Sequence, residues 1–265
     1  MFITVATTLM TAQKKKKQAD FFIYGRHTLE EALAGAPHSI KAAYLNERSA
    51  NDDLRIKLDQ AQIAVKKLSG GNFDQTQYHS HQGVIARVDP TKLLNSLEDI
   101  GTRVSREGNI ALMLLGEVQD PQNVGAIIRS AAAFGMSGVL LPRVKQAPIT
   151  GAVAKASAGL VFRIPIYSIG NINQTLQKLK HHGFWVYGLD QNGDHSIEQE
   201  SFDRPSVFVM GNEAYGLRQE VRKNCDINLQ IPLSEQAESL NVSAAAAIAA
   251  YVWRVNVAAK THDNK

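Results

Sequence analysis

The first quarter of the chain alternates helical and strand-like patterns of apolar residues. Residues 20–89 contain a helical pattern around Leu29 and a second helical pattern over about 51–62. The strand-like runs of this segment are Ile40–Leu45, Ala64–Val65 and Val84–Val88. We therefore predict a small α/β domain over residues 20–89.

A longer segment begins at the continuous apolar run Ile110–Leu115, which is typical of a strand buried on both faces. Strand-like and helix-like patterns then alternate, and the further predicted strands are Val139–Leu141, Phe162–Ile166, Phe184–Leu189, Val207–Met210 and Ile227–Ile231. Such alternation predicts a mostly parallel sheet covered by helices. Residues 109–265 are thus predicted to be a second α/β domain. A polar linker, residues 90–108, is predicted to join the two domains, with one helical turn around Leu93–Ile100.

The distribution of charge adds a basic N-terminal tail to the two predicted domains. The 265 residues are 44% hydrophobic, which is enough for the cores of two modest domains. The formal net charge is +4, and the four lysines Lys14–Lys17 account for all of it. We predict a disordered basic tail over residues 1–19, with Met10 as an alternative start. Residues 20–265 sum to zero, so any affinity for a polyanion there must come from local patches.

Cys225 is the only cysteine, which excludes an intrachain disulfide and a cysteine-based zinc site. It also fits a reducing, cytoplasmic compartment. The histidines show no metal-ligand spacing, so we expect no metal. No apolar run reaches the roughly 20 residues of a membrane span, and we expect no membrane association. The basic tail has its charges after its apolar stretch, which is the reverse of a secretory signal.

The alternating pattern alone would suit a nucleotide-binding fold. However, no G-x-G-x-x-G follows the first strand of the larger domain, and no G-x-x-x-x-G-K-[ST] occurs. Three other motifs contain the candidate chemistry.

The first motif, Asp120–Arg129, starts with an Asp-Pro turn and continues as an apolar helix. Asn123 is the expected N-cap, and the free amides of that helix end would suit a phosphate group. Gly125 would allow another backbone to approach closely. Arg129 is a single cation in an apolar helix, and is either a snorkelling side chain or a functional group.

The second motif, Val209–Leu217, follows a predicted strand at its carboxyl end, where ligands bind in parallel sheets. Glu213 is either an acid at a helix start or an active-site carboxylate. The third motif runs from Ile231 to Ser243. Its Ser239 and Asn241 suit N-caps of a helix that extends to about Ala259, and capping is compatible with an active-site role.

In this order and spacing, the three motifs resemble the SpoU–TrmH class of SPOUT methyltransferases over about residues 108–258. The resemblance implies a deep trefoil knot that holds S-adenosylmethionine, which periodicity cannot show because knots are rare. It implies transfer of the methyl group to a ribose 2′-hydroxyl of RNA. It also implies a homodimer, with the C-terminal helix in the interface and Arg129 near the donor site of the partner. Tyr24–His27 resembles the start of the RNA-binding N-terminal domain in two-domain members.

The resemblance also implies roles for individual residues. The implied catalytic residues are Arg129, Asn123, Glu213, Ser239 and Asn241, and the implied donor-binding residues are Gly211, Ile231 and Leu240. Family proposals have an arginine, helped by an RNA phosphate, activate the 2′-hydroxyl. A free arginine stays protonated, so electrostatic stabilisation of the developing alkoxide is the alternative.

The chain departs from the family pattern at Leu233 and Glu235, which stand where methionine and glycine are usual. If the donor loop needs a positive φ at position 235, Glu235 strains it. The two-domain layout most resembles enzymes that methylate a guanosine ribose in large-subunit (23S-type) rRNA. A tRNA guanosine enzyme and a catalytically silent RNA-binding homologue remain alternatives. An unrelated α/β nucleotide-binding protein is disfavoured by the missing glycine motifs.

Overall fold

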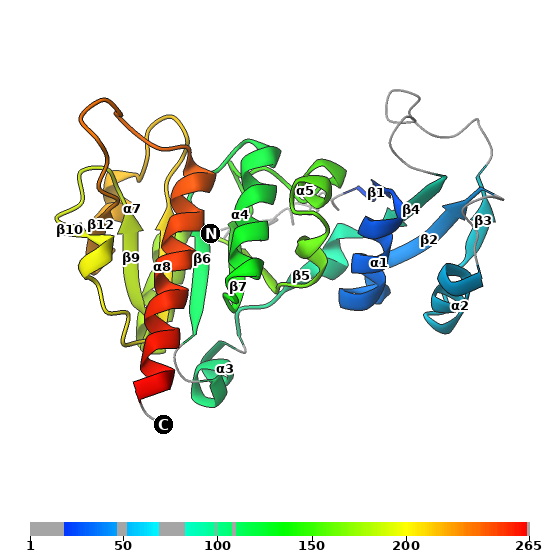
Figure 1. The fold of residues 1–265 in the computed structure, drawn as a ribbon, viewed down its shortest axis with the longest axis horizontal. Helices are drawn as coiled ribbons and strands as arrows, with labels where there is room; N and C mark the ends of the chain where they lie inside the picture. Colours follow the sequence, from blue (N-terminus) through cyan, green and yellow to red (C-terminus); the bar gives the residue numbers. More distant parts are fainter. Residues whose placement is uncertain (1–18, 47–51, 69–82, 99, 108–109, 264–265) are drawn as a thin grey trace, which may run out of the picture.

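The computed structural model describes residues 19–46, 52–68, 83–98, 100–107 and 110–263. The predicted basic tail lies outside the described residues except for its last residue. The described chain forms two α/β units that lie side by side, each built on one sheet (Figure 1).

The smaller unit has a four-stranded sheet in the order β1-β4-β2-β3. Its elements are β1 (Phe21–Tyr24), α1 (Arg26–Gly35), the short 3-10 helix η1 (Pro37–Ser39), β2 (Ile40–Leu45), α2 (Asp52–Gln60), β3 (Val65–Lys67) and β4 (Val84–Val88). Strand β4 is antiparallel to both β1 and β2, whereas β2 and β3 are parallel. The predicted helices and strands of residues 20–89 are confirmed, and β2 and β4 have the predicted bounds.

The larger unit has an eight-stranded sheet in the order β10-β12-β9-β11-β6-β7-β8-β5, and every pair in it is parallel. Its strands are β5 (Leu94–Asn95), β6 (Ala111–Leu115), β7 (Gly138–Pro142), β8 (Ile166–Ile169), β9 (Trp185–Leu189), β10 (His195–Ser196), β11 (Ser206–Met210) and β12 (Ile227–Gln230). Its helices are α3 (Ile100–Glu107), α4 (Pro121–Ala133), α5 (Gly151–Ala156), α6 (Ile172–His181), α7 (Gln219–Arg222) and α8 (Val242–Asp263), with 3-10 turns η3 (Pro90–Leu93), η4 (Leu160–Phe162) and η5 (Ile197–Gln199). The predicted parallel sheet is confirmed. The threading of the chain into a knot stays a prediction.

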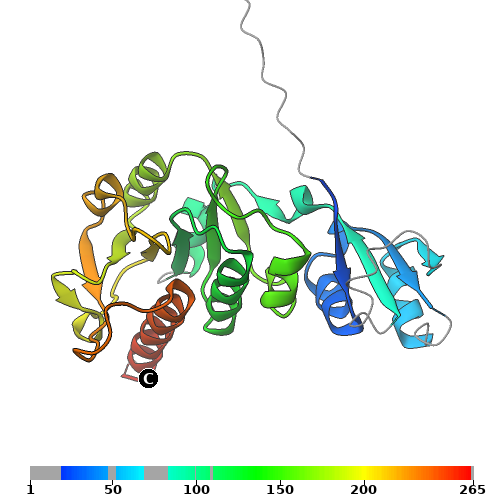
Figure 2. The same ribbon diagram turned by 90° about the horizontal axis from the view of Figure 1, so that it is seen from above.

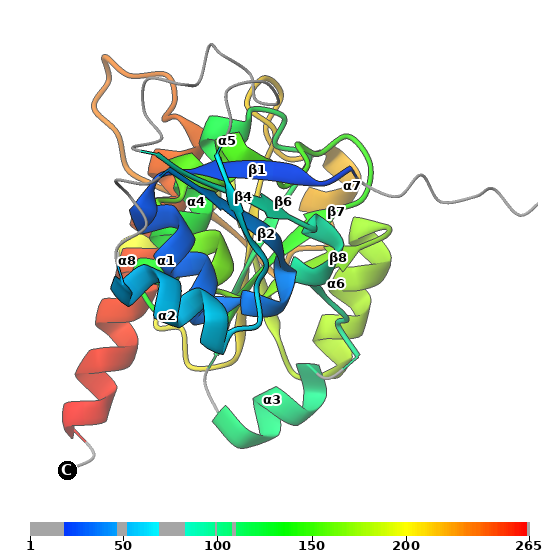
Figure 3. The same ribbon diagram turned by 90° about the vertical axis from the view of Figure 1, so that its right-hand side faces the viewer.

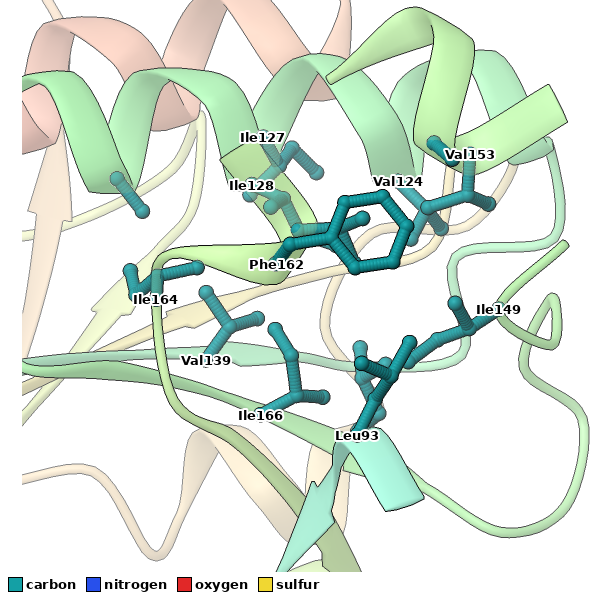
Figure 4. Close-up of a cluster of buried hydrophobic side chains, with 14 of the residues drawn as sticks. Leu93, Val124, Ile127, Ile128, Val139, Ile149, Val153, Phe162, Ile164 and Ile166 are labelled. Carbon is teal, nitrogen blue, oxygen red and sulfur yellow. The ribbon is translucent and has the colours of Figure 1, made fainter. Parts of the chain in front are cut away.

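Helices cover both faces of the large sheet, and this explains why its central strand is continuously apolar. In β6, Met113 and Leu115 point to a core shared with α4, α5 and α8, while Leu112 and Leu114 point to a second core with α3, α6 and α7. Figure 4 shows part of the first core, where Val124, Ile127 and Ile128 of α4 lie over β7 and β8. Figure 2 shows α8 and α4 on the same side of the sheet, and Figure 3 shows α6 and α8 on opposite flanks.

One predicted strand is wrong in position. The apolar run at Phe162–Ile166 was expected to be a strand, but its first residue ends η4 and β8 begins only at Ile166. Gly159, with φ +83°, starts the η4 turn in a left-handed conformation. Val161 and Phe162 are buried in that turn, so their apolar character reflects burial and not extension.

The predicted linker contains more regular structure than one helical turn. Residues 94–95 form β5, which pairs with β8 at the edge of the large sheet. The helix expected around Leu93–Ile100 is instead α3, which starts at Ile100, and its Arg103 donates to the carbonyl of Ser137 at 2.8 Å. A two-residue strand is too short for any periodicity to reveal it.

The two units also touch directly, because α1 and β1 of the smaller unit contact η4 and α5 of the larger unit. Arg163 forms an ion pair with Glu31 at 2.6 Å. Gly151, the first residue of α5, lies so close to β1 that an added Cβ would be 2.3 Å from the carbonyl oxygen of Phe22. The contact between the units is therefore formed by specific residues of both.

Helix α8 leaves part of its apolar surface open. Its segment Val242–Ala259 has a mean hydropathy of 1.4 and is 28% buried, so by length and composition alone it could cross a membrane. Core and interface helices have the same properties, and α8 packs against α4 and β11. Tyr251 and Val255 are 54% and 47% exposed, which leaves an apolar stripe on its outer face.

Candidate functional site

Three of the five predicted catalytic residues meet in one hydrogen-bonded cluster. Asn123 Nδ2 donates to Glu213 Oε1 at 3.2 Å, and Asn241 Nδ2 donates to Asn123 Oδ1 at 3.1 Å. Each of the three side chains comes from a different motif, after β6, β11 and β12 respectively. Because the carboxyl ends of parallel strands share one edge of the sheet, segments far apart in sequence meet there.

Glu213 is the centre of this cluster. Its carboxylate also accepts from the backbone amides of Gln119 and Asp120, at 3.2 Å each, and from Asn212 Nδ2 at 3.3 Å. Packing around the carboxylate acts to raise its pKa, but the backbone and Asn123 hydrogen bonds outweigh this and lower the pKa of Glu213 below its usual value. Glu213 is therefore ionised at neutral pH, beside the positive end of α4.

The prediction that Asn123 caps α4 is wrong. The cap is Asp120, whose side chain accepts from the amide of Gln122 at 2.8 Å. Pro121 occupies the first helical position, where its fixed φ is favourable and its missing N–H costs nothing, and so the cap must precede it. The amide of Asn123 is free to join Glu213 and Asn241 instead.

Asn241 both caps a helix and joins the cluster. Its Oδ1 accepts from the amide of Ser243 at 2.8 Å and from the Ser243 hydroxyl at 2.6 Å, just before α8 begins. The capping predicted for Asn241 is confirmed, whereas the capping predicted for Ser239 is wrong. Ser239 is exposed and makes no side-chain hydrogen bond with the described residues.

Arg129 lies apart from the cluster. It is exposed on α4 and forms no hydrogen bond or ion pair with the described part of the chain. The buried face of α4 consists of Val124, Ile127, Ile128 and Ala131, so Arg129 points away from the core and is not a snorkelling side chain within it.

A cleft of about 950 Å³ opens beside the cluster. It is lined by the loops that follow β9, β11 and β12, and it includes Gly211, Glu213, Ile231, Ser239, Leu240 and Asn241. Leu233 and Leu240 are apolar but each 38% exposed. Arg129 does not line the cleft.

Two glycines of the motifs have packing roles. A Cβ on Gly211 would be 2.3 Å from the carbonyl carbon of Gly216, because the 211–217 loop folds back on itself. A Cβ on Gly125 would be 2.4 Å from the Cβ of Ala156 in α5. The close approach expected at Gly125 exists, but the partner is a helix of the same protein.

The strain considered for Glu235 is absent. The non-glycine residues with positive φ in the described chain are Gln62, Glu117, Lys145, Ala158 and Phe202. Glu235 is not among them, and it lies in a turn closed by the hydrogen bond from the Ala237 amide to the Ser234 carbonyl. The backbone therefore gives no reason to expect that glycine at position 235 would improve donor binding.

Sequence reasoning missed a second polar cluster next to the first, formed by Glu117, Tyr215 and Arg218. Arg218 Nη2 donates to Glu117 Oε2 at 2.7 Å, and the Tyr215 hydroxyl donates to the same oxygen. Glu117 lies two residues after the end of β6, at the edge where ligands bind in parallel sheets, and this was the signal available in the sequence. Among the described residues, no three histidine, cysteine, aspartate or glutamate side chains gather as a metal site.

Comparison with known families agrees with this geometry. The SpoU rRNA methylase family matches residues 110–251, and the substrate-binding domain of RNA 2′-O ribose methyltransferases matches residues 22–94. The chain belongs to the SpoU rRNA methylase family. Its SpoU unit includes all three motifs and the cleft, and the smaller unit corresponds to the substrate-binding domain.

Curated relatives of this SpoU protein include two with closely similar length. The 23S rRNA (guanosine-2′-O-)-methyltransferase RlmB of Vibrio vulnificus is 32% identical over 231 residues, which are 86% of this chain and 93% of the relative. A Staphylococcus haemolyticus protein assigned to the TrmH family of tRNA/rRNA methyltransferases is 31% identical over 236 residues, covering 88% of this chain and 94% of the relative.

Solved structures share the fold of both units. An AdoMet-bound rRNA methyltransferase from Sinorhizobium meliloti has a TM-score of 0.74 and 25% identity, and the match covers 90% of this chain and 88% of that one. The SpoU methyltransferase AviRb from Streptomyces viridochromogenes also has a TM-score of 0.74, with 20% identity over 91% of each chain.

Proposed function

We propose that this SpoU protein transfers a methyl group from S-adenosylmethionine to the 2′-hydroxyl of a guanosine ribose in large-subunit rRNA. The observation that supports this most strongly is the Asn123–Glu213–Asn241 cluster beside the cleft. It joins the three motifs of the family in one place. The named function of the Vibrio relative supports guanosine as the target nucleoside and 23S-type rRNA as the substrate.

The residues of the cleft fit the methyl donor. Between Ser234 and Leu240, the one backbone hydrogen bond within the described residues joins Ala237 to Ser234, so most amides and carbonyls of this loop are open to a ligand. Leu233 and Leu240 offer apolar surface to a flat base. Gly211, Ile231 and Leu240 would hold the donor, which supplies an electrophilic methyl group when bound.

The chain's own residues would position and stabilise the reacting hydroxyl. Glu213 is ionised and saturated with hydrogen bonds, which suits it to hold the 211–217 loop against α4 and makes it a poor proton acceptor. Arg129 is an exposed cation that could approach a 2′-oxygen or an RNA phosphate from outside. As a guanidinium, Arg129 would stabilise the negative charge that develops on the 2′-oxygen without taking its proton. Removal of the proton by Arg129 would instead need help from an RNA phosphate.

Arg129 does not line the cleft of its own chain, so we propose a homodimer in which it reaches the cleft of the partner. The exposed face of α4 adjoins α8, where the rings of Phe134 and Tyr251 lie 5.7 Å apart. The open apolar stripe of α8 continues this surface. Pairing of two such surfaces would bury the stripe and complete the site.

We propose that the protein acts in the cytoplasm, with residues 20–89 as the substrate RNA-binding domain, 90–108 as the connection and 109–265 as the SPOUT domain. A tRNA guanosine is the second candidate substrate, because the Staphylococcus relative is assigned to tRNA/rRNA methyltransferases. The same relatives are named enzymes, which disfavours a catalytically silent homologue.

Transfer of a labelled methyl group from S-adenosylmethionine to purified 23S-type rRNA and to bulk tRNA tests the proposal. Nucleoside analysis of the product should show 2′-O-methylguanosine in the rRNA arm. Labelling of tRNA alone would select the second candidate, and labelling of neither RNA despite donor binding would contradict both.

A further inference from the structure

The loop that contains Glu213 also holds an exposed aromatic ring in a fixed position. Tyr215 is 50% exposed and lines the cleft. Its hydroxyl donates to Glu117, and the guanidinium of Arg218 lies over the ring, 5.4 Å from its centroid. A side chain that is half in solvent is thus held at two points.

Glu117 anchors this arrangement. One oxygen of its carboxylate accepts from Tyr215 and from both Nη2 and Nε of Arg218, at 2.7 and 3.1 Å for the arginine. Its carbonyl accepts from Asn212 Nδ2 at 2.8 Å. The residue has φ +68°, a left-handed conformation that is unfavourable for a side chain other than glycine. The anchor persists despite this strain, as strained residues at binding sites do.

The core does not need Tyr215. Its neighbour Leu217 packs against the core formed with α6 and α7 and so fixes the loop, whereas Tyr215 belongs to neither apolar core. Arg218 covers one side of the ring, and half of the Tyr215 side chain stays exposed where it lines the cleft. A fixed, flat, half-exposed ring with a cation beside it matches a nucleobase, because bases stack on aromatic rings regardless of sequence.

Two bases could use this surface, namely the adenine of the donor and the base of the target nucleotide. The ring is tied to Glu117, which comes after β6 and does not line the cleft, whereas the open loop suited to the donor, between Ser234 and Leu240, comes after β12. Sequence-specific RNA recognition commonly uses unstacked bases that stack on aromatic side chains. The geometry therefore favours the target base.

We propose that Tyr215, held by Glu117 and Arg218, is the surface on which the base of the methylated nucleotide stacks. This rests on the proposed RNA 2′-O-methylation. The ring fixes the base and so directs its ribose toward the Asn123–Glu213–Asn241 cluster.

The test compares Tyr215→Phe, Tyr215→Leu and Tyr215→Ala in the full-length protein. For each variant, affinity for 23S-type rRNA fragments, KM for RNA, kcat and the donor dissociation constant are measured. The Ala and Leu variants should weaken RNA binding and raise KM by about 5- to 100-fold, the loss expected for one stacked base. The Phe variant keeps the ring and the Arg218 contact but loses the Glu117 hydrogen bond, so its loss should be clearly smaller than that of the Ala and Leu variants. Donor affinity should be unchanged in all three.

Equal losses in the Phe and Ala variants would overturn the proposal, because they would assign the effect to the hydroxyl. Weaker donor binding in the Ala and Leu variants would overturn it in favour of the donor adenine. RNA affinity is measured without turnover, so it tests the stacking of the base even if the wild-type protein methylates no RNA. Failure of the wild-type protein to methylate RNA would contradict the proposed function but not the stacking.

Discussion

At the scale of single residues, the account depends on the charge of Glu213. Folding surrounds this carboxylate with donors from the start of α4 and from Asn123, and these contacts lower its pKa. Because the folded pKa is lower than the unfolded one, the ionised carboxylate stabilises the fold above the ordinary glutamate pKa. This stabilisation is lost as the pH falls through the lowered pKa.

Glu213→Gln should therefore destabilise the protein at pH 7, and the difference from wild type should shrink as the pH falls below the ordinary glutamate range. Urea unfolding at several pH values measures this. Glu198→Gln, at an exposed glutamate without a hydrogen bond to the described residues, is the matched control and should show no such trend. A difference that does not depend on pH would argue against an ionised Glu213.

Arg129→Ala should lower kcat for methyl transfer by at least about 100-fold, the usual loss when one stabilising charge is removed from an active site. Donor binding, measured by calorimetry, should stay near wild type, since Arg129 does not line the cleft of its own chain. Arg129→Lys should also fail, because lysine lacks the planar guanidinium fork. Near-normal turnover in either variant would rule out a catalytic role for Arg129.

Residue-level patterns in the sequence predicted which side chains belong together but not how they meet. Asn123, Glu213 and Asn241 were expected at one site from their motifs, and the hydrogen bonds that join them depend on strand order. Motif spacing cannot give the position of Arg129 on the outer face of α4. The Glu117–Tyr215–Arg218 cluster was missed because Glu117 lies 98 residues from Tyr215 and 101 from Arg218, and only the fold brings it to them.

At the scale of elements, the sequence predicted strands that are buried on both faces more reliably than short or irregular ones. β6, β7, β9 and β11 were placed within about a residue, since their apolar runs end at turns. The run at Phe162–Ile166 is also rich in apolar residues, yet its first residue ends the 3-10 turn η4 and only its last residue belongs to a strand. Apolar character reports burial, and periodicity cannot separate a buried turn from a buried strand.

Helix α8 provides a test of the proposed dimer. Tyr251→Asp places a charge on the exposed apolar stripe and should shift the protein toward monomers, with loss of methyl transfer. Ile56→Asp, at a residue of equal exposure on α2, is the control and should leave the oligomeric state unchanged. Sedimentation at micromolar concentration measures both. A wild-type monomer that is fully active would contradict the shared site.

At the scale of the whole molecule, we propose that the contact between the two units aligns bound RNA with the cleft. The sequence predicted two domains and a polar connection, but not the ion pair of Arg163 with Glu31 or the close approach at Gly151. Such contacts join residues more than 100 positions apart, and no local pattern encodes them.

Gly151→Ala should disturb this contact, because its Cβ would meet the Phe22 carbonyl. Methyl transfer to RNA should fall by about 10- to 100-fold, the effect of misplacing a substrate by about 1 Å, while donor affinity stays unchanged. Gly170→Ala is the control, since a Cβ there would meet nothing within 4 Å. Equal activity in the two variants would show that the contact does not align the RNA.

The central claim is that this SpoU protein methylates the 2′-hydroxyl of a guanosine in large-subunit rRNA. Nucleotide-resolution mapping of ribose methylation tests it most directly, in rRNA and tRNA from cells that have the protein, lack it, or contain only Arg129→Ala. The account predicts one guanosine 2′-O-methyl mark in large-subunit rRNA that is present with the wild-type protein and absent in the other two strains. An unchanged methylation map in cells that lack the protein would contradict it.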